Sequence, residues 1–390
     1  MKTHTILKDE DTYLIPTYKK MPLALVRGEG CYVWDADGKR YLDFYGGHCV
    51  TALGHCPPPV VEAIQKQSTQ LIFYSNVVYS DIRAHAARLL SEMSPLPRIF
   101  FCNSGTEAIE TALKIARKST KRNGIISTKQ GFHGRTLGSL ATTWNPSYRE
   151  PFREILAPFH YFAEFGDLSS VQSILNEKPD IAAILIEPIQ SIGGMVEASS
   201  EFVQELRKLC DQNGTLLIFD EIQTGVGRTG TFSISEQLEI KPDIITLAKS
   251  LGSGIPVGAV LVSESLSDEI HYGDHGSTFG GGMIAMSAVS ATLESIRDDH
   301  LMNQAPKIFE AIADTIKPYI LGIYGRGCLI GVQVEPPVSD VLPILREHGV
   351  LAGGSANPNV MRLMPPLTTK PEHIREFGEA FKRAMKRVNI

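Results

Sequence analysis

The sequence lacks the features of membrane, secreted and nucleic-acid-binding proteins. Among its 390 residues no run of about eighteen apolar residues occurs, so we expect no membrane-spanning helix. Basic residues are not in excess, and a formal net charge of −5 at pH 7 argues against non-specific binding to nucleic acid. The segment Met1–Lys20 contains neither an apolar signal-peptide core nor an Arg-rich amphipathic stretch. We therefore expect a cytoplasmic protein.

Patterns of metal-binding and disulfide-forming residues are missing as well. The six cysteines include no CxxC pair and, without a targeting signal, they predict reduced thiols that pack in the interior. The eleven histidines form no HExxH motif and no ligand cluster, so we expect no metal site. What remains is the composition of an ordinary globular enzyme, with 43% apolar and 21% charged residues.

Short apolar runs alternate with helical patterns through the middle of the chain. The runs are continuous rather than alternating, which is typical of strands covered on both faces. Helical spacing predicts helices at Thr106–Lys118 and Glu201–Asn213, the second followed by the stop signal Gly214. This order predicts an α/β domain with a mainly parallel sheet. The expected strands are Arg98–Cys102, Gly124–Thr128, Ile181–Glu187, Thr215–Asp220, Ile244–Ala248 and Val257–Ser263.

The two ends of the chain follow a different pattern. Gly30–Phe44 predicts a β-hairpin with Asp37 and Gly38 at its turn. Near the C-terminus we expect a helix at Met302–Ile316, strand-like pieces at Gly327–Val334 and a final amphipathic helix. A chain of this length suggests two domains. We predict a large domain at 46–285 and a smaller α+β domain formed by 1–45 together with 286–390.

Two charged residues stand at the ends of apolar strands. Lys249 follows one expected strand and precedes a glycine-rich turn, where partial burial would lower the pKa of its amine and make it a nucleophile. Asp220 ends another, and a buried carboxylate there requires a positive partner. A protonated pyridine nitrogen would be such a partner, as in pyridoxal phosphate. By themselves, a surface lysine and an arginine ion pair explain the two positions equally.

A small polar segment, Ser104-Gly105-Thr106-Glu107, opens the first expected helix. Free backbone N–H groups at a helix N-terminus suit a phosphate. An ordinary N-cap with Glu107 in the first turn would have the same sequence, so both interpretations remain open.

The segment Gly225–Gly230 satisfies the dinucleotide pattern GxGxxG. It follows Asp220 and Glu221, whose carboxylates would repel a pyrophosphate, and the residues after it do not predict the required helix. An NAD-linked oxidoreductase is therefore the disfavoured alternative from another class.

Taken together, the motifs resemble those of class III aminotransferases from one end of the chain to the other. The resemblance implies fold type I of the enzymes that use pyridoxal phosphate, with a mostly parallel seven-stranded sheet, a small α+β domain built from both termini, and active sites shared across a homodimer. It rests on YLDFYGGHCVTALGHCPP, NSGTEAIETALKIAR, GFHGRTLGSLATT, ILIEPIQ, LIFDEIQTGVGRTG, TLAKSLGSGIPVGA, HGSTFGGG and NVMRLMPPL.

The resemblance implies a role for each residue that matches a motif. Lys249 would carry pyridoxal phosphate as a Schiff base, and Asp220 would pair with the ring nitrogen. The other implied cofactor contacts are Ser104, Gly105 and Thr106 to the phosphate, Gln223 to the phenolic oxygen, Phe132 and Ile222 on the two ring faces, and Thr278 from the neighbouring subunit.

Substrate recognition is implied for two arginines. Arg135 would bind a substrate carboxylate and Arg362 the α-carboxylate of glutamate, since a guanidinium fork suits bidentate recognition. Ile192 stands where many members have a glutamate that pairs with the second arginine. Tyr18 and His48 match two further substrate-site positions, the tyrosine only loosely.

The sequence thus predicts a transaminase of arginine biosynthesis that moves the ω-amino group of an N-acylated ornithine to 2-oxoglutarate, N-acetylornithine being the favoured donor. The alternative is a 4-aminobutyrate, ornithine or alanine–glyoxylate transaminase, which would use the same core residues. A pyridoxal-phosphate-binding protein with little catalysis is the third possibility.

Overall fold

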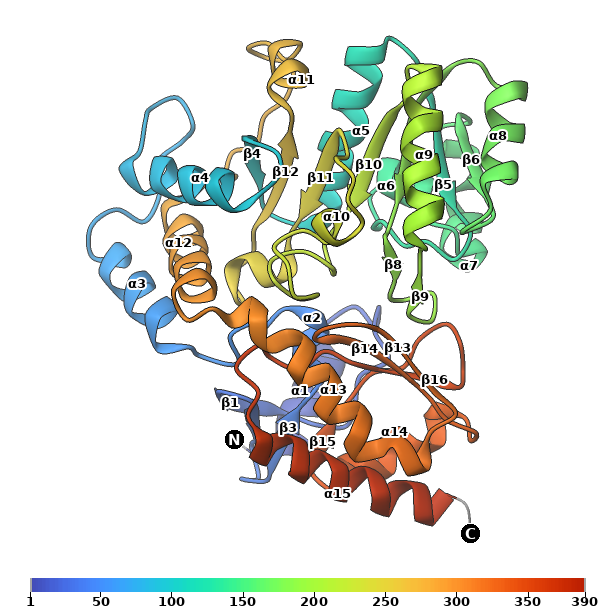
Figure 1. The fold of residues 1–390 in the computed structure, drawn as a ribbon. Helices are drawn as coiled ribbons and strands as arrows, with labels where there is room; N and C mark the ends of the chain where they lie inside the picture. The colour runs from blue at the N-terminus through green and yellow to red at the C-terminus, as the bar shows by residue number, and fades with distance from the viewer. Residues whose placement is uncertain (1, 389–390) are drawn as a thin grey trace.

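The computed structural model describes residues 2–388 and contains four sheets of seven, four, three and two strands. The seven-stranded sheet and its helices form the upper half of the view in Figure 1. The four- and three-stranded sheets lie in the lower half with the last helices of the chain, so the beginning and the end of the chain are together there.

The seven-stranded sheet has the order β4-β12-β11-β10-β7-β5-β6. Strand β12 is antiparallel to both neighbours, and the remaining neighbouring pairs are parallel. The six expected strands are confirmed, and β6 is an edge strand that the sequence analysis missed. The bounds are β4 Arg98–Cys102, β5 Gly124–Thr128, β6 His160–Ala163, β7 Ile181–Ile186, β10 Leu216–Asp220, β11 Ile244–Leu247 and β12 Gly258–Val262.

Helices cover both faces of this sheet, which explains the continuous apolar runs. On β10, Ile218 packs in the buried cluster that contains helix α5 (Gly105–Thr120). Its neighbour Phe219 belongs to the cluster on the other face, with α9 (Ser200–Asn213). Both helices were predicted from the sequence, and Gly214 ends the second with a left-handed φ of 59°.

The two terminal sheets combine residues from both ends of the chain. The predicted hairpin is present as β2 and β3, and β1 and β15 extend it to the order β1-β2-β3-β15; the other sheet has the order β13-β14-β16. The strands are β1 Leu25–Glu29, β2 Tyr32–Asp35, β3 Arg40–Asp43, β13 Gly322–Arg326, β14 Leu329–Gln333, β15 Val350–Leu351 and β16 Val360–Leu363, and the two-stranded sheet is β8 Ile189–Gln190 with β9 Val196–Glu197.

The C-terminal helix α15 (Pro371–Val388) buries Ile374, Phe377, Phe381 and Met385, as its spacing predicted. The helix expected from Met302 begins later, as α13 (Ala305–Ile316), after a 3₁₀ turn. The remaining helices are α1 Thr3–Tyr13, α2 Gly46–Cys49, α3 Pro58–Ser68, α4 Asp81–Met93, α6 Leu137–Thr142, α7 Pro146–Arg149, α8 Leu168–Glu177, α10 Ile234–Gln237, α11 Glu264–Asp268, α12 Met283–Asp298 and α14 Val338–Glu347, with 3₁₀ turns η1 Glu150–Ile155, η2 Lys249–Gly252, η3 Leu301–Gln304 and η4 Lys317–Tyr319.

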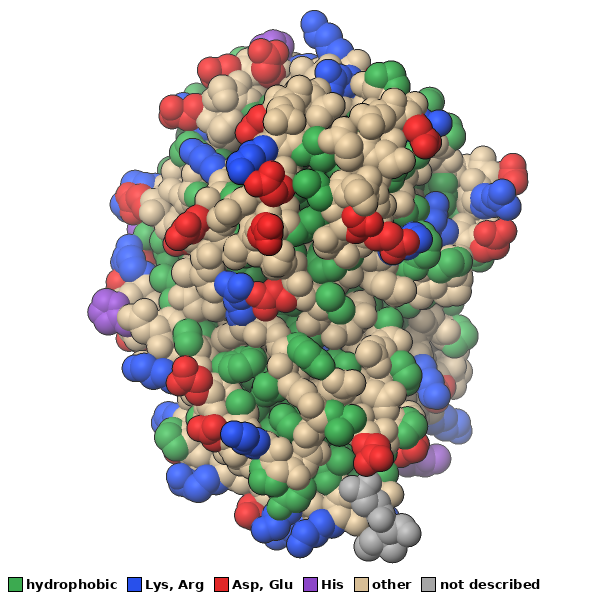
Figure 2. All heavy atoms as spheres, turned by 45° about the vertical axis from the view of Figure 1, so that its right-hand side comes forward, with side chains coloured by type: hydrophobic (Ala, Val, Ile, Leu, Met, Phe, Trp, Pro, Cys, Tyr) green, Lys and Arg blue, Asp and Glu red, His purple; other side chains and the backbone are tan. Residues whose placement is uncertain are grey.

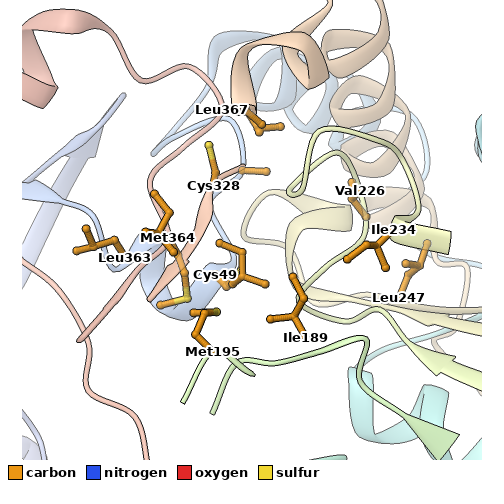
Figure 3. Packing of buried hydrophobic residues seen from close by; sticks show 14 of the residues in the cluster. Cys49, Ile189, Met195, Val226, Ile234, Leu247, Cys328, Leu363, Met364 and Leu367 are labelled. Carbon is orange, nitrogen blue, oxygen red and sulfur yellow. The ribbon is translucent and has the colours of Figure 1, made fainter. Parts of the chain in front are cut away.

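The core is continuous between the two halves of the molecule. Figure 3 shows Leu363 and Met364, from the terminal side, converging with Cys49, Val226 and Leu247 in one buried cluster. On the face seen in Figure 2, acidic and basic side chains are interspersed. Within residues 2–388 no helix is long and apolar enough to cross a membrane.

Candidate active site

A cavity of about 420 Å³ lies at the carboxyl ends of the central strands. This is the edge at which ligands bind in open α/β sheets. Nine of the predicted site residues line it: Ser104, Gly105, Thr106, Phe132, Arg135, Asp220, Ile222, Gln223 and Lys249.

Lys249 begins the turn η2 between β11 and β12, with a left-handed φ of 42°. Its side chain faces the cavity. Burial lowers the pKa of its amine, and the charge of Arg362 adds to this effect, while Asp220 and Glu187 oppose it. A lowered pKa increases the fraction of neutral, nucleophilic amine at neutral pH.

Asp220 ends β10, is only 4% exposed, and has a partner that the sequence analysis missed. Nδ1 of His133 lies 2.8 Å from its Oδ2, and the backbone N–H of Ile222 donates to Oδ1 at 3.1 Å. An ionised carboxylate only accepts, so Nδ1 carries the proton. His133, which lines the cavity as well, therefore holds the Asp220 carboxylate in place.

Glu187 is a second buried carboxyl group that the sequence analysis assigned no role. It follows β7, lines the cavity, and accepts a hydrogen bond from the backbone N–H of Phe132 at 2.8 Å. Burial raises the pKa of Glu187, His133 counteracts this, and Asp220 raises it further. The signal for it was available, because Glu187 ends an apolar run just as Asp220 does. We call Lys249, Asp220, His133 and Glu187 the sheet cluster.

The helix N-terminus at Ser104 is both an N-cap and part of the cavity. Ser104 Oγ accepts from the backbone N–H of Glu107 at 3.3 Å, as the capping interpretation required. The first turn of α5 nevertheless faces the cavity through Gly105 and Thr106. A Cβ at Gly105 would lie 2.7 Å from Cδ1 of Ile222, so a larger residue here would require the Ile222 side chain to shift.

The walls between this helix end and Lys249 are formed by Phe132 and Ile222, with Gln223 beside them. Oε1 of Gln223 is buried without a hydrogen-bond partner. A buried acceptor of this kind is costly unless a ligand supplies a donor. Thr278 is exposed and does not line the cavity of its own chain, so its role in a partner's site stays a prediction.

Arg362 lies in β16 and is 5% exposed. Its Nε donates to the carbonyl of Gly354 at 2.6 Å, and its Nη1 to Oγ of Ser191 at 3.3 Å. Ile192 replaces the usual carboxylate, and the ion pairs among residues 2–388 do not include Arg362. Within residues 2–388 its guanidinium therefore hydrogen-bonds to neutral groups and forms no ion pair. Burial lowers the pKa of Arg362, and the charge of Glu187 opposes this effect from a greater distance.

Tyr45 and His48 are close enough to the charged groups of the site for their pKa values to be affected. The charge of Arg362 acts on both residues, and that of Lys249 acts on His48. The hydroxyl of Tyr45 is hydrogen-bonded to Nδ1 of His48. Burial lowers the pKa of His48 to about 3, with further contributions from the charges of Lys249 and Arg362. His48 is thus neutral at pH 7. We call Tyr45, His48 and Arg362 the terminal cluster.

The other two predicted substrate residues have different positions. Arg135 is exposed at the cavity, with its guanidinium carbon 3.4 Å from the ring centroid of Tyr148. Stacking of this kind keeps the guanidinium fork oriented while it remains accessible. Tyr18 is 81% exposed beside α1 and does not line the cavity.

Comparison with known proteins decides the family. The model of the family described as Aminotransferase class-III matches residues 13–385. The chain belongs to the class III aminotransferases. This aminotransferase is 37% identical, over 97% of its length and 96% of the relative's, to acetylornithine aminotransferase of Methanosarcina mazei. It is 41% identical to the enzyme of the same name from Methanopyrus kandleri, over 92% of each chain.

Among solved structures, an ornithine aminotransferase from Toxoplasma gondii superimposes with a TM-score of 0.93 at 30% identity, covering 99% of this chain and 95% of that one. That structure has pyridoxal phosphate at partial occupancy in its active site. This class III aminotransferase therefore has the fold type I architecture, and its family implies pyridoxal phosphate as the cofactor.

Proposed function

We propose that this class III aminotransferase moves the ω-amino group of an N-acylated ornithine to 2-oxoglutarate, giving a semialdehyde and glutamate. N-acetylornithine is the favoured donor, which would assign the enzyme to arginine biosynthesis. The observation that carries the proposal is a buried amine, Lys249, whose pKa is lowered by burial and by the charge of Arg362, an arginine that forms no ion pair among residues 2–388. The names of the curated relatives support the donor.

The residues that line the cavity fit pyridoxal phosphate. Free N–H groups at the start of α5 suit its phosphate, and the cavity is lined by the apolar side chains of Phe132 and Ile222, which suit the faces of a flat ring. The unpartnered Oε1 of Gln223 would accept from the phenolic group in its protonated form. Asp220 would pair with the ring nitrogen, where a positive charge compensates a carboxylate that is 4% exposed.

When bound, pyridoxal phosphate supplies a ring that takes up negative charge from the substrate carbon. Lys249 would move the proton at that carbon as general base and then general acid, for which a lowered amine pKa is suited. Asp220, held by His133, would maintain the positive charge of the ring nitrogen. Glu187 would fix the backbone of Phe132 and thus one wall of the cavity.

Arg362 would bind the α-carboxylate of glutamate or 2-oxoglutarate, because in the described part of the chain its hydrogen bonds go to neutral acceptors and it forms no ion pair. Arg135, stacked on Tyr148 and exposed, would bind the distal carboxylate or that of the donor. An N-acylated ornithine has one free amine, so the acyl group directs the reaction to the ω-position.

We further propose a homodimer in which Thr278 completes the phosphate site of the partner. Around Thr278 the surface is apolar, with Val77 83%, Tyr79 104% and Phe279 64% exposed. Nδ2 of Asn76 donates to the carbonyls of Ser277 and Gly280. These hydrogen bonds connect the segment that contains Val77 and Tyr79 to the loop that contains Thr278. The division into a domain at 46–285 and one formed by 1–45 with 286–390 is proposed likewise.

The donor is tested by steady-state turnover against 2-oxoglutarate. N-acetylornithine, N-succinylornithine, ornithine, 4-aminobutyrate and alanine would be compared side by side. We expect the highest kcat/KM for an N-acylated ornithine. A higher value for 4-aminobutyrate, ornithine or alanine would favour the alternative transaminases, and no turnover with any of them would refute the assignment.

The shared site is tested by mixing two inactive variants. Lys249→Ala lacks the amine, and Thr278→Ala lacks the phosphate contact. A mixed dimer would contain one intact site, so activity should return on mixing under conditions of subunit exchange. If each site is complete within one chain, mixing restores nothing.

A further inference from the structure

The loop Gly225–Gly230, which imitates a dinucleotide fingerprint, lies inside the protein between its two halves. Gly227 and Gly230 have left-handed φ values of 82° and 106°. A Cβ at Gly227 would lie 3.1 Å from Cγ of Met302, and one at Gly230 would lie 3.1 Å from Cγ of Pro306. The glycines thus allow the loop to pass close to the turn η3 and the start of α13. Because the loop is buried against these elements, a nucleotide has no room to bind to it.

This loop carries a completely buried arginine, Arg228, with an exposed fraction of 0%. Its Nη1 donates to the carbonyl of Pro365 at 2.5 Å, and its Nη2 to Oγ of Ser250 at 3.3 Å. Oγ of Ser250 in turn donates to the carbonyl of Cys49 at 3.2 Å. The carbonyl of Arg228 accepts from the backbone N–H of Cys328 at 2.8 Å, at the start of β14.

Arg228 lacks an ion-pair partner among residues 2–388, and its Nε has no hydrogen-bond partner. Burying a guanidinium in this way is costly, and an apolar side chain of similar volume would fill the space without the desolvation penalty. The side chain therefore does not serve stability alone. Its specific property is a rigid fork that reaches two segments at once.

Those two segments carry the main residues of the site. Ser250 directly follows Lys249 in the turn η2, and Pro365 lies on the segment that leaves β16 after Arg362. One guanidinium thus joins the turn with the reacting amine to the strand with the carboxylate-binding arginine. Figure 3 shows the neighbouring Val226 in the core that also contains Leu367 and Cys328.

We propose that Arg228 is a positioning residue that fixes the Lys249 turn against the Arg362 segment and so sets the distance between amine and carboxylate clamp. This rests on the proposed function, because it takes Lys249 and Arg362 in the roles given above. The carboxylate of an N-acylated donor would bind Arg135, whereas 2-oxoglutarate must place its α-carboxylate at Arg362 while its keto carbon lies within reach of Lys249. The keto acid is therefore the substrate most sensitive to a change in that distance.

The test compares Arg228→Met, Arg228→Lys and Ser250→Ala as holoenzymes. For Arg228→Met we expect KM for 2-oxoglutarate to rise on the order of tenfold to a hundredfold, with cofactor absorbance retained. Arg228→Lys keeps the charge and one donor and should recover part of this loss. Ser250→Ala removes one of the two contacts and should give the same change in smaller degree, which keeps the proposal testable if Arg228→Met does not fold.

A second measurement does not depend on activity. Amide hydrogen exchange should become faster in 249–252 and 360–367 of Arg228→Met, in the cofactor-free and the loaded protein alike, because the two segments lose their connection.

Arg122→Met is the matched control, because Nη1 of Arg122 donates to the carbonyls of Ile181, Asn213 and Gly214 far from the cavity. It should lower thermal stability without raising KM. The proposal is overturned if Arg228→Met folds with unchanged KM and exchange, or if Arg122→Met gives the same KM change at equal loss of Tm. Absence of turnover with 2-oxoglutarate in the wild type would refute the proposed function instead, while the exchange measurement would still decide the role of Arg228.

Discussion

The sheet cluster and the terminal cluster hold their charges in different ways. In the sheet cluster each acid has a partner: Asp220 is bonded to His133, and Glu187 accepts from the backbone of Phe132. In the terminal cluster Arg362 forms no ion pair within residues 2–388 and donates to a carbonyl and a hydroxyl, and His48 is neutral at pH 7. The difference suggests that the first cluster is organised before substrate arrives and the second is completed by an anionic substrate.

The largest effect should come from the sheet cluster, in Lys249→Ala. Loss of the amine removes both the nucleophile and the proton-transferring group, so turnover with any donor should fall by roughly 10⁴-fold. Steady-state rates and the absorbance of the bound cofactor would be measured together. Lys208→Ala is the control, since Lys208 is exposed and paired with Glu205. Turnover above about one hundredth of wild type would contradict the catalytic role.

A smaller and more selective effect is expected in the terminal cluster, from Arg362→Ala. Losing a charged bidentate contact should lower kcat/KM for glutamate on the order of 10²–10³-fold. Cofactor absorbance should remain, because Arg362 does not line the cavity that would hold the ring. Arg135→Ala serves for comparison and should cost less, about tenfold, because an exposed guanidinium is screened by water. Unchanged glutamate kinetics in Arg362→Ala would remove the clamp role.

A carboxylate introduced near Arg362 should give that arginine a partner of opposite charge, just as each acid of the sheet cluster already has a hydrogen-bonding partner. In Ile192→Glu the new carboxylate would pair with Arg362 and compete with the α-carboxylate of glutamate. We expect the ratio of kcat/KM for an ω-amino donor to that for glutamate to rise by about tenfold or less. Ile192→Gln has similar size without charge and should leave the ratio near wild type. If the donor profile does not move in Ile192→Glu, the missing carboxylate has no influence on donor choice.

The smallest effect concerns stability and His48. Its folded-state pKa of about 3 is below the value of about 6.5 in the unfolded chain, so the unfolded state binds more protons between these pH values. Stability should therefore fall as the pH falls from 6.5. In His48→Gln the loss between pH 6.5 and pH 5 should be smaller by at most about 2 kcal/mol. Equilibrium unfolding of the two holoenzymes in urea would measure it, and parallel pH curves would speak against a buried neutral imidazole.

The fold was predictable to the extent that burial is visible in the sequence. Strands β10 and β11 were found because both faces are covered and the apolar runs are continuous. Strand β6 was missed because it is a short edge strand, HYFA, that is buried only at Ala163. The start of α13 was placed too early, because apolar spacing does not distinguish a 3₁₀ turn from the helix that follows.

Site residues could be predicted where they belong to a recognisable sequence motif. They could not be predicted where they are identified only by a contact with another residue in the folded chain. Lys249 and Asp220 were candidates by position, but a surface lysine and an arginine ion pair also explained them, and the resemblance supplied the expected roles of both and of Arg362. His133 and Tyr45 were missed because their functions depend on contacts with Asp220 and His48 that only the folded chain creates. The GxGxxG segment is buried, which agrees with the interpretation that disfavoured a dinucleotide there, but nothing in its spacing indicated that Arg228 would be buried.

The antiparallel direction of β12 has a consequence for motion. Strand β11 ends at Leu247, where it pairs with β12, and Lys249 follows two residues later as the first residue of the buried turn η2, so its backbone belongs to an ordered turn next to the sheet. In the proposed mechanism the amine would nevertheless change partners during each catalytic cycle. The movement must then come from rotation of the lysine stem. Such rotations are faster than loop movements, so we expect the swing of Lys249 to follow substrate arrival without delaying it.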